Sequence, residues 1–349
     1  MKNSCRILGY DLIRIVAIFM VVTIHSNVIY LTNNFGRLEW IIMMEITAIC
    51  LVSVPLFFML SGALLLNANH VVGVNELFTK RLSKQFIPFI LWSLIYVFLR
   101  ILMGKLPLSI NSITKLLYEP AYYQFWFMYT LLAIYLLLPI LQVIVQNSNQ
   151  KQIEYLLGIW LVFSVLIPNI SYFYKEFRIS EHIDLILCEG YIGYFLLGFY
   201  LSKYKRDIPN KIGLFLTVLG ISIIEIGAYL EWKYCIDLQI KYTGYMYQEY
   251  RSLGVIIAVT GIFLICQKIN INHSSIFNKI IIKTSELSIG VFYVHMFILI
   301  AIECIGFSGE NSMFIVIFKT ILVYIISLFL SYIISKIPIL GSVLLIRKN

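Results

Sequence analysis

The chain has 349 residues, of which 60% are hydrophobic and only 13% are charged, and its mean hydropathy is +0.87. Soluble domains are about 45–50% apolar and about 25% charged, so this composition excludes a soluble globular protein and indicates one all-α, polytopic membrane domain over residues 1–349. The net charge of +9 comes from scattered loop lysines and arginines without an aromatic-interleaved basic patch, which argues against a nucleic-acid partner. The six cysteines have no metal-ligand spacing, so we expect no metal.

Ten apolar runs along the chain predict ten transmembrane helices. A helix needs about 20 apolar residues to cross the hydrocarbon layer of a bilayer. The runs fall at about residues 8–31, 40–67, 85–103, 123–145, 153–170, 186–202, 212–231, 252–268, 286–306 and 313–335. We therefore expect a multi-pass bundle of about ten spans in a cell membrane, with the lipid bilayer as its main partner.

The distribution of lysine and arginine predicts the orientation of the bundle. With an even number of spans, both termini lie on one side of the membrane. Sixteen of the 27 lysines and arginines lie in the segments on that side and nine in the segments on the opposite side. Because cytoplasmic loops carry the excess of positive charge, the bias predicts cytoplasmic N- and C-termini.

The first predicted span, "DLIRIVAIFMVVTIH", contains three ionisable side chains: Asp11, Arg14 and His25. Such groups cost about 2.5–3.5 kcal/mol each at the middle of a membrane helix and usually face the bundle interior. Helical geometry places Arg14 and His25 within about 20° of the same face, about 16 Å apart along the axis. Asp11, three residues before Arg14, is placed to pair with it. The spacing predicts one inward-facing polar stripe; the alternative is that the Asp11–Arg14 pair anchors the helix end and His25 bonds a neighbouring carbonyl.

The segment after the second span is the next candidate for a site. "VPLFFMLSGALLL" is followed by "FTKRLSKQFIPFILW", and Ser61-Gly62 in the former favours close helix contact. Lys80, Arg81 and Lys84 then lie on the predicted cytoplasmic side, where a polyanionic cofactor could dock. Ordinary positive-inside anchoring is the alternative.

Other polar groups fall in or near the later spans. "SELSIGVFYVHMFIL" places His295 near the middle of the ninth span, either as a second functional histidine or as a hydrogen-bonded packing residue. Glu45 and Lys319 lie close to the outer ends of their spans, where long side chains can extend toward the interface. Glu225 and Glu303 have no partner that the sequence identifies. Tyr-rich outer segments such as "YCIDLQIKYTGYMYQEYR" suit a sugar ligand or an interfacial aromatic belt.

Several of these segments together resemble the integral-membrane acyltransferase family 3. "YDLIRIVAIFMVVTIH" is similar to its Arg-x10-His signature, "VPLFFMLSGALL" to its Phe-Phe-x-Leu-Ser-Gly segment, and "KRLSKQFIPFILW" to the basic segment that follows. "YQFWFMYTLLAIYLLLPIL" resembles the Leu-Trp-Phe-x-Tyr segment, with Gln124-Phe125 where His-Leu is frequent. "YIGYFLLGFYLSKY" and "SIGVFYVHMFIL" resemble later blocks.

The resemblance implies an O-acyltransferase that moves an acyl group, usually acetyl, from cytoplasmic acyl-CoA to a hydroxyl of a cell-surface or lipid-linked glycan. It implies that Arg14 and His25 are key positions. We expect His25, Arg14 and His295 to be the catalytic residues, with His25 as a general base or as the acceptor of the acyl group. The residues expected to bind the donor, acetyl-CoA, are Arg14, Lys80, Arg81 and Lys84. The alternative function is a membrane transporter of a small solute or of an acyl or glycan precursor, although no inverted repeat is evident.

Overall fold

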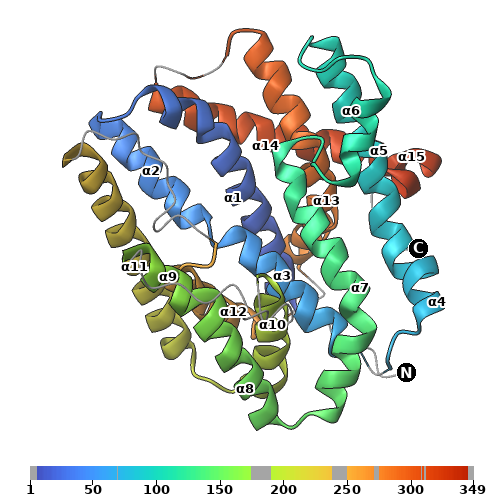
Figure 1. Cartoon of the computed structure of the whole chain (residues 1–349), viewed down its shortest axis with the longest axis vertical. Coiled ribbons are helices and arrows are strands. Elements are labelled where there is room, and N and C mark those ends of the chain that lie inside the picture. Colours follow the sequence, from blue (N-terminus) through green and yellow to red (C-terminus); the bar gives the residue numbers. More distant parts are fainter. Residues whose placement is uncertain are drawn as a thin grey trace.

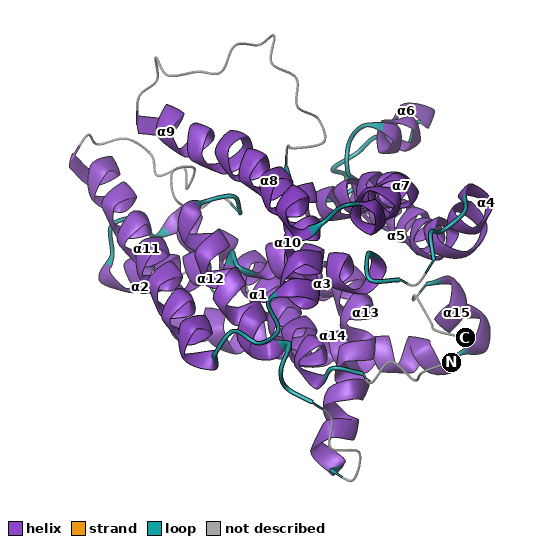
Figure 2. Ribbon diagram, turned by 90° about the horizontal axis from the view of Figure 1, so that it is seen from below, coloured by secondary structure: helices purple, strands orange, loops and turns teal. Residues whose placement is uncertain are grey.

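The structure, a computed structural model, describes residues 6–68, 70–173, 190–237, 250–270, 275–307, 309 and 312–344. All elements in these ranges are helical, apart from one isolated antiparallel bridge between Ile7 and Asn270. Figure 1 shows the helices assembled into one bundle, and Figure 2 shows it from below. The prediction of an all-α fold is confirmed.

The α-helices are α1 (Leu8–Asn33), α2 (Leu38–Cys50), α3 (Ser53–Leu65), α4 (Val74–Glu76), α5 (Ser83–Leu102), α6 (Ile110–Thr114), α7 (Trp126–Asn147), α8 (Gln150–Leu161), α9 (Ile167–Phe173), α10 (Ile192–Tyr204), α11 (Asn210–Asp237), α12 (Leu253–Cys266), α13 (Ile276–Cys304), α14 (Met313–Lys336) and α15 (Pro338–Val343). Short π-helical turns, Leu77–Leu82 and Val162–Leu166, lead into α5 and α9. Two 3-10 turns, Lys115–Leu117 and Tyr123–Phe125, lie between α6 and α7.

Among the described residues, eight helical stretches are long and apolar enough to cross a membrane. They are Leu8–Asn33, Leu38–Leu65, Val74–Leu102, Tyr123–Asn147, Gln150–Ile170, Asn210–Asp237, Ile276–Cys304 and Met313–Lys336. The predicted spans 252–268 and 186–202 correspond to the shorter helices α12, with 14 residues, and α10, with 13, and residues 186–189 lie outside the described ranges. The chain is therefore a multi-pass membrane protein, while the side on which its termini lie stays a prediction.

The second predicted span is one helical stretch, Leu38–Leu65, that is interrupted by a turn between α2 and α3. α2 ends at Cys50 and α3 begins at Ser53. Pro55 explains the break, because proline has no backbone N–H to donate to the carbonyl four residues earlier, and its ring crowds that carbonyl. The residue four positions before Pro55 is Leu51, which lies in the turn between the helices.

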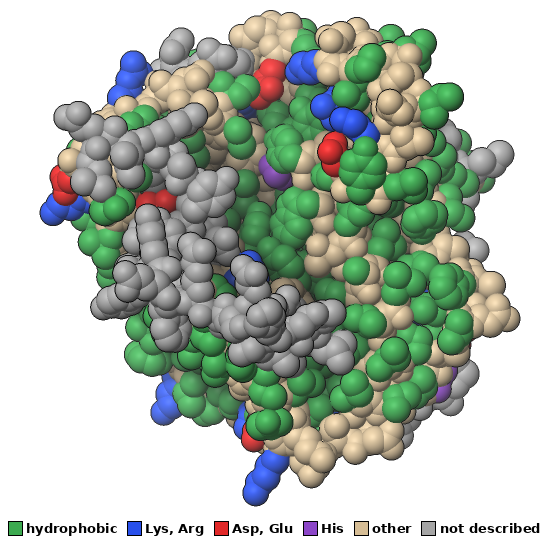
Figure 3. Space-filling model, in the orientation of Figure 1, with side chains coloured by type: hydrophobic (Ala, Val, Ile, Leu, Met, Phe, Trp, Pro, Cys, Tyr) green, Lys and Arg blue, Asp and Glu red, His purple; other side chains and the backbone are tan. Residues whose placement is uncertain are grey.

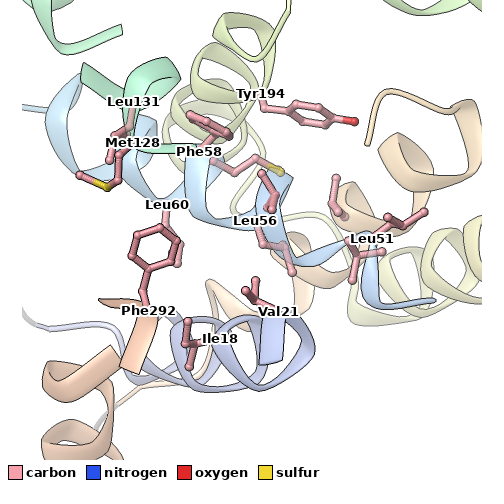
Figure 4. Packing of buried hydrophobic residues seen from close by; sticks show 14 of the residues in the cluster. Ile18, Val21, Leu51, Leu56, Phe58, Leu60, Met128, Leu131, Tyr194 and Phe292 are labelled. Atoms are coloured by element: carbon pink, nitrogen blue, oxygen red, sulfur yellow. The ribbon is translucent and has the colours of Figure 1, made fainter. Parts of the chain in front are cut away.

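α1 runs through the middle of the bundle and contacts α2, α3, α12, α13 and α14. Figure 4 shows Ile18 and Val21 of α1 facing Leu56 and Leu60 of α3, with Phe292 of α13 beside them. The outer helices instead leave large apolar side chains exposed, for example Phe215 of α11. A lipid environment accounts for such exposure, because lipid tails are as apolar as these side chains.

Candidate active site

The polar stripe of α1 begins at a buried carboxylate. Asp11 is only 1% exposed, and it accepts hydrogen bonds from Arg6 Nε at 2.7 Å and Nη2 at 2.8 Å. It also accepts from Arg14 Nη1 at 2.9 Å and from Ser285 Oγ of α13 at 2.7 Å. The predicted Asp11–Arg14 pair is confirmed, and Arg6 and Ser285 complete the cluster. The hydrogen bond to Asp11 raises the pKa of Arg6, so this guanidinium stays charged.

A second acidic residue extends this cluster along α13. Arg6 Nη1 donates to Glu286 Oε1 at 3.1 Å, and Lys283 Nζ lies 4.0 Å from Glu286 Oε2. Two carboxylates therefore face three cations, and the cluster formed by Arg6, Asp11, Arg14, Lys283 and Glu286 carries net positive charge. We call it the cation cluster.

One cavity of about 640 Å³ joins the cation cluster to His25. Its walls are mainly apolar and come from α1, α3, α7 and α13; they include Ile18, Val21, Phe57, Leu65, Leu131 and Phe292. Figure 3 shows a hollow in the face of the molecule, bordered mainly by hydrophobic side chains. The volume lies within the range of about 300–1,000 Å³ that is usual for ligand sites. Such a cavity suits an elongated ligand with an anionic end and an apolar remainder.

Two histidines from different helices meet at the far end of the cavity from Arg14. The rings of His25 and His295 stack with centroids 5.4 Å apart and 22° between their planes, and Tyr123 contacts His25 edge-on at 4.9 Å. His295 Nδ1 lies 3.0 Å from the carbonyl oxygen of Val291. Because a carbonyl only accepts, Nδ1 carries a proton, and in the neutral ring Nε2 then carries a lone pair. Among the described residues, neither His295 Nε2 nor His25 Nδ1 has a hydrogen-bond partner.

The structure places the predicted site residues in three settings. Arg14 and His25 both line the cavity, whereas His295 is completely buried behind His25 and does not line it. The predicted basic docking segment, Lys80, Arg81 and Lys84, also lies outside the cavity lining. The catalytic and donor-binding roles of all these residues stay predictions.

The sequence reading missed several cavity residues, namely Arg6, Lys283, Glu286, Gln124, Trp126 and Tyr250. From the sequence alone, Arg6 and Lys283 count only toward the charge bias that predicts the orientation of the bundle. The i,i+3 spacing of Lys283 and Glu286, just before the ninth span, was the available signal for a polar cluster there.

The prediction for Lys319 is wrong. Lys319 does not extend toward the interface: it is completely buried, and its Nζ lies 3.2 Å from Glu303 Oε1, the partner that the sequence did not identify. Glu45 of α2 lies beside Glu225 of α11, so each of these two glutamates has the other as a neighbour across the contact between the helices. Sequence spacing could not identify these partners because each pair joins two different helices.

Comparison with known proteins decides the family. The family model described as the acyltransferase domain, that of acyltransferase family 3, matches residues 7–336. The chain belongs to acyltransferase family 3. No curated protein and no solved structure matches it.

The family match covers α1 to α14 and therefore both ends of the cavity. The resemblance predicted from the sequence motifs is confirmed. Membership of acyltransferase family 3 implies acyl transfer in the membrane and hence an acyl donor, so the cavity between the cation cluster and His25 is the candidate active site.

Proposed function

We propose that this family 3 acyltransferase moves an acetyl group from cytoplasmic acetyl-CoA to a hydroxyl of a cell-surface or lipid-linked glycan. The observation that carries the proposal is the cavity that joins the cation cluster to His25. With the predicted cytoplasmic N-terminus, the cation cluster faces the compartment that contains acetyl-CoA. His25 then lies deeper, toward the side on which a glycan acceptor would be presented.

The cation cluster is suited to the phosphates of coenzyme A. Hydrogen bonds between guanidinium or ammonium groups and phosphate are charge-assisted and are among the stronger polar contacts. Arg14 is held toward the cavity by Asp11 at 2.9 Å. The apolar walls beyond it, such as Ile18 and Leu65, would enclose the pantetheine arm and keep water from the thioester. Lys80, Arg81 and Lys84 would add positive charge outside the cavity.

His25 is the proposed general base. Its imidazole accepts the proton of the acceptor hydroxyl while the hydroxyl oxygen attacks the carbonyl carbon of the thioester. The carbon–sulfur bond then breaks, the imidazolium returns its proton to the departing thiolate, and the products are an O-acetyl ester and coenzyme A. His295 is a positioning residue in this scheme, since its ring stacks on His25 at 5.4 Å and is itself fixed by the Val291 carbonyl at 3.0 Å.

The test is His25→Ala in proteoliposomes supplied with radiolabelled acetyl-CoA and with surface glycan extracted from a strain lacking the gene. General acid–base catalysis contributes about 10²–10⁴-fold, so we expect acetyl transfer to fall at least a hundredfold while acetyl-CoA binding is retained. His70→Ala is the matched control, because His70 is 61% exposed and lies outside the cavity lining.

Two results would contradict the proposal. Acetyl transfer at the wild-type rate by His25→Ala would remove His25 as the base. Solute uptake by wild-type proteoliposomes, without label appearing on the glycan, would favour the transporter alternative. Arg14→Ala separates the two ends of the cavity, since it is expected to weaken acetyl-CoA binding itself.

A further inference from the structure

Gln124 has an unusual setting at the His25 end of the cavity. It lies in the 3-10 turn Tyr123–Phe125 that precedes α7, it lines the cavity, and it is only 2% exposed. Neither Nε2 nor Oε1 of its amide forms a hydrogen bond of normal geometry with the described residues. The Tyr96 hydroxyl makes only a looser contact, because it already donates to Tyr293 O at 2.8 Å and accepts from Phe297 N at 2.9 Å.

An amide buried in this way is unfavourable unless a ligand completes its hydrogen bonds. Burying a polar group without a partner costs free energy, and most buried polar groups in proteins are paired. The amide presents a donor, Nε2–H, next to an acceptor, Oε1. The carbonyl of a thioester offers acceptors only, and would therefore leave Oε1 without a partner. A pair of neighbouring hydroxyls on a sugar ring offers both a donor and an acceptor.

The surroundings of Gln124 also fit a saccharide. Trp126 and Tyr250 line the same cavity, and their ring centroids lie 5.5 Å apart. Aromatic faces bury the apolar C–H face of a sugar while leaving its hydroxyls available to polar groups. Burial raises the pKa of Tyr250 to about 12, so its hydroxyl stays protonated and neutral. The residue before Gln124, Tyr123, contacts the His25 ring, which connects this turn directly to the proposed base.

We propose that Gln124 is an acceptor-binding residue: its amide holds two neighbouring hydroxyls of a saccharide, and this contact selects the hydroxyl presented to His25. This inference rests on the proposed acetyl transfer to a glycan. It divides the cavity into a donor end at the cation cluster and an acceptor end at Gln124, Trp126 and Tyr250.

The experiment compares Gln124→Leu with wild type in the proteoliposome assay, titrating acetyl-CoA and the glycan extracted from the deletion strain separately. Leucine fills similar space but has no polar atoms. We expect the KM for the glycan to rise about tenfold or more, since a hydroxyl loses its partners in a buried site. The KM for acetyl-CoA should stay within about twofold of wild type. Gln124→Glu retains only the acceptor function, and we expect an intermediate glycan KM.

Gln146→Leu is the matched control. Gln146 lies near the other end of α7, is exposed, and is not part of the cavity. The same substitution there should leave both KM values unchanged. Folding is checked by the melting temperature and by monodispersity in detergent, and Gln124→Asn, which keeps both amide atoms on a shorter side chain, carries the test if Gln124→Leu is unstable.

An unchanged glycan KM in Gln124→Leu overturns the inference, and so does an increase confined to the KM for acetyl-CoA. Failure of the proposed function has a different signature, because wild-type protein would then transfer no label to the glycan at all. Wild-type transfer combined with normal kinetics in the variant would therefore refute the role of Gln124 alone.

Discussion

Asp11 bonds the arginines of the cation cluster but does not itself line the cavity. It is 1% exposed, while the side chains of Arg6 and Arg14, which bond it, are 36% and 30% exposed. Burying a carboxylate costs several kcal/mol unless it is paired and hydrogen-bonded. Three side chains meet this requirement at Asp11, and in doing so they fix the directions of both guanidinium groups. The role of Asp11 is therefore to position Arg14.

Asp11→Asn should destabilise the protein. The substitution keeps the shape but removes the negative charge that balances Arg6 and Arg14. Removing one partner of a fully buried pair typically costs about 3–5 kcal/mol. Because the two guanidinium groups left behind are about a third exposed and can be hydrated, we expect a cost below that range, seen as a lower melting temperature in detergent, together with weaker acetyl-CoA binding. Ser285→Ala removes one neutral donor to the same carboxylate and should cost only about 1 kcal/mol. Equal melting temperatures for Asp11→Asn and wild type would contradict this role.

Sequence spacing identified only the part of the cation cluster that lies on α1. Asp11 and Arg14 are three residues apart on one helix, so helical geometry alone predicts their contact. Two residues of α13, more than 270 residues later in the chain, complete the cluster: Ser285 donates to Asp11, and Glu286 accepts from Arg6. The setting of Gln124 could not be predicted from the sequence either. Its neighbours in the chain, Tyr123 and Phe125, show that the turn is aromatic, but only the tertiary structure reveals that the Gln124 amide lies in a cavity wall.

At the scale of elements, α3 and α10 are packed at backbone contact through two glycines. A Cβ atom added at Gly62 would lie 1.7 Å from the Phe195 carbonyl oxygen, and one added at Gly198 would lie 2.0 Å from the Met59 carbonyl oxygen. The sequence prediction of close helix approach at Ser61-Gly62 is confirmed. This contact matters for the cavity, because Phe57 and Ser61 of α3 form part of its wall.

Gly62→Ala should separate α3 from α10. The new methyl group meets backbone, which cannot rotate away as a side chain would, so the helices must move apart and lose packing along their length. We expect the free energy of unfolding to fall by an amount at the upper end of the usual range for overpacking, about 1–3 kcal/mol. The measurement is the melting temperature, which should be lower than that of wild type.

Gly158→Ala is the opposite case within α8. No atom lies within 4 Å of a Cβ added there, and alanine favours a helix interior over glycine by about 0.5–1 kcal/mol. This variant should melt at or slightly above the wild-type temperature. A Gly62→Ala protein that melts like Gly158→Ala would contradict the close-contact explanation.

At the scale of the whole molecule, the apolar composition and the spacing of apolar runs were sufficient to predict a helical membrane bundle. The hydrophobic requirement for crossing a bilayer acts on each segment separately, so it can be evaluated from sequence alone. The pairing of membrane charges could not be predicted in this way: Lys319–Glu303 and Glu45–Glu225 each join different helices. In the membrane interior such partners are required, but the bundle's tertiary arrangement decides which residues they are.

The orientation of the bundle decides which end of the cavity acetyl-CoA can reach. The charge bias predicts a cytoplasmic N-terminus, which places the cation cluster at the cytoplasmic end. Two exposed lysines test this: Lys105, in the loop after α5, and Lys151, at the start of α8. Each is replaced by cysteine in a protein whose own six cysteines are changed to serine. A membrane-impermeant maleimide is then applied to intact cells, whose outer membrane, where present, has been made permeable.

We expect Lys105→Cys to be labelled in intact cells and Lys151→Cys only after the cytoplasmic membrane is permeabilised, because the two positions lie on opposite sides in the predicted topology. Retained acetyl transfer shows that each variant is folded. The reverse labelling pattern would contradict the predicted orientation, and it would also place the cation cluster away from cytoplasmic acetyl-CoA. The donor end of the cavity would then have to be reassigned, since the phosphates of the donor could not reach Arg14 from the cytoplasm without crossing the His25 end first.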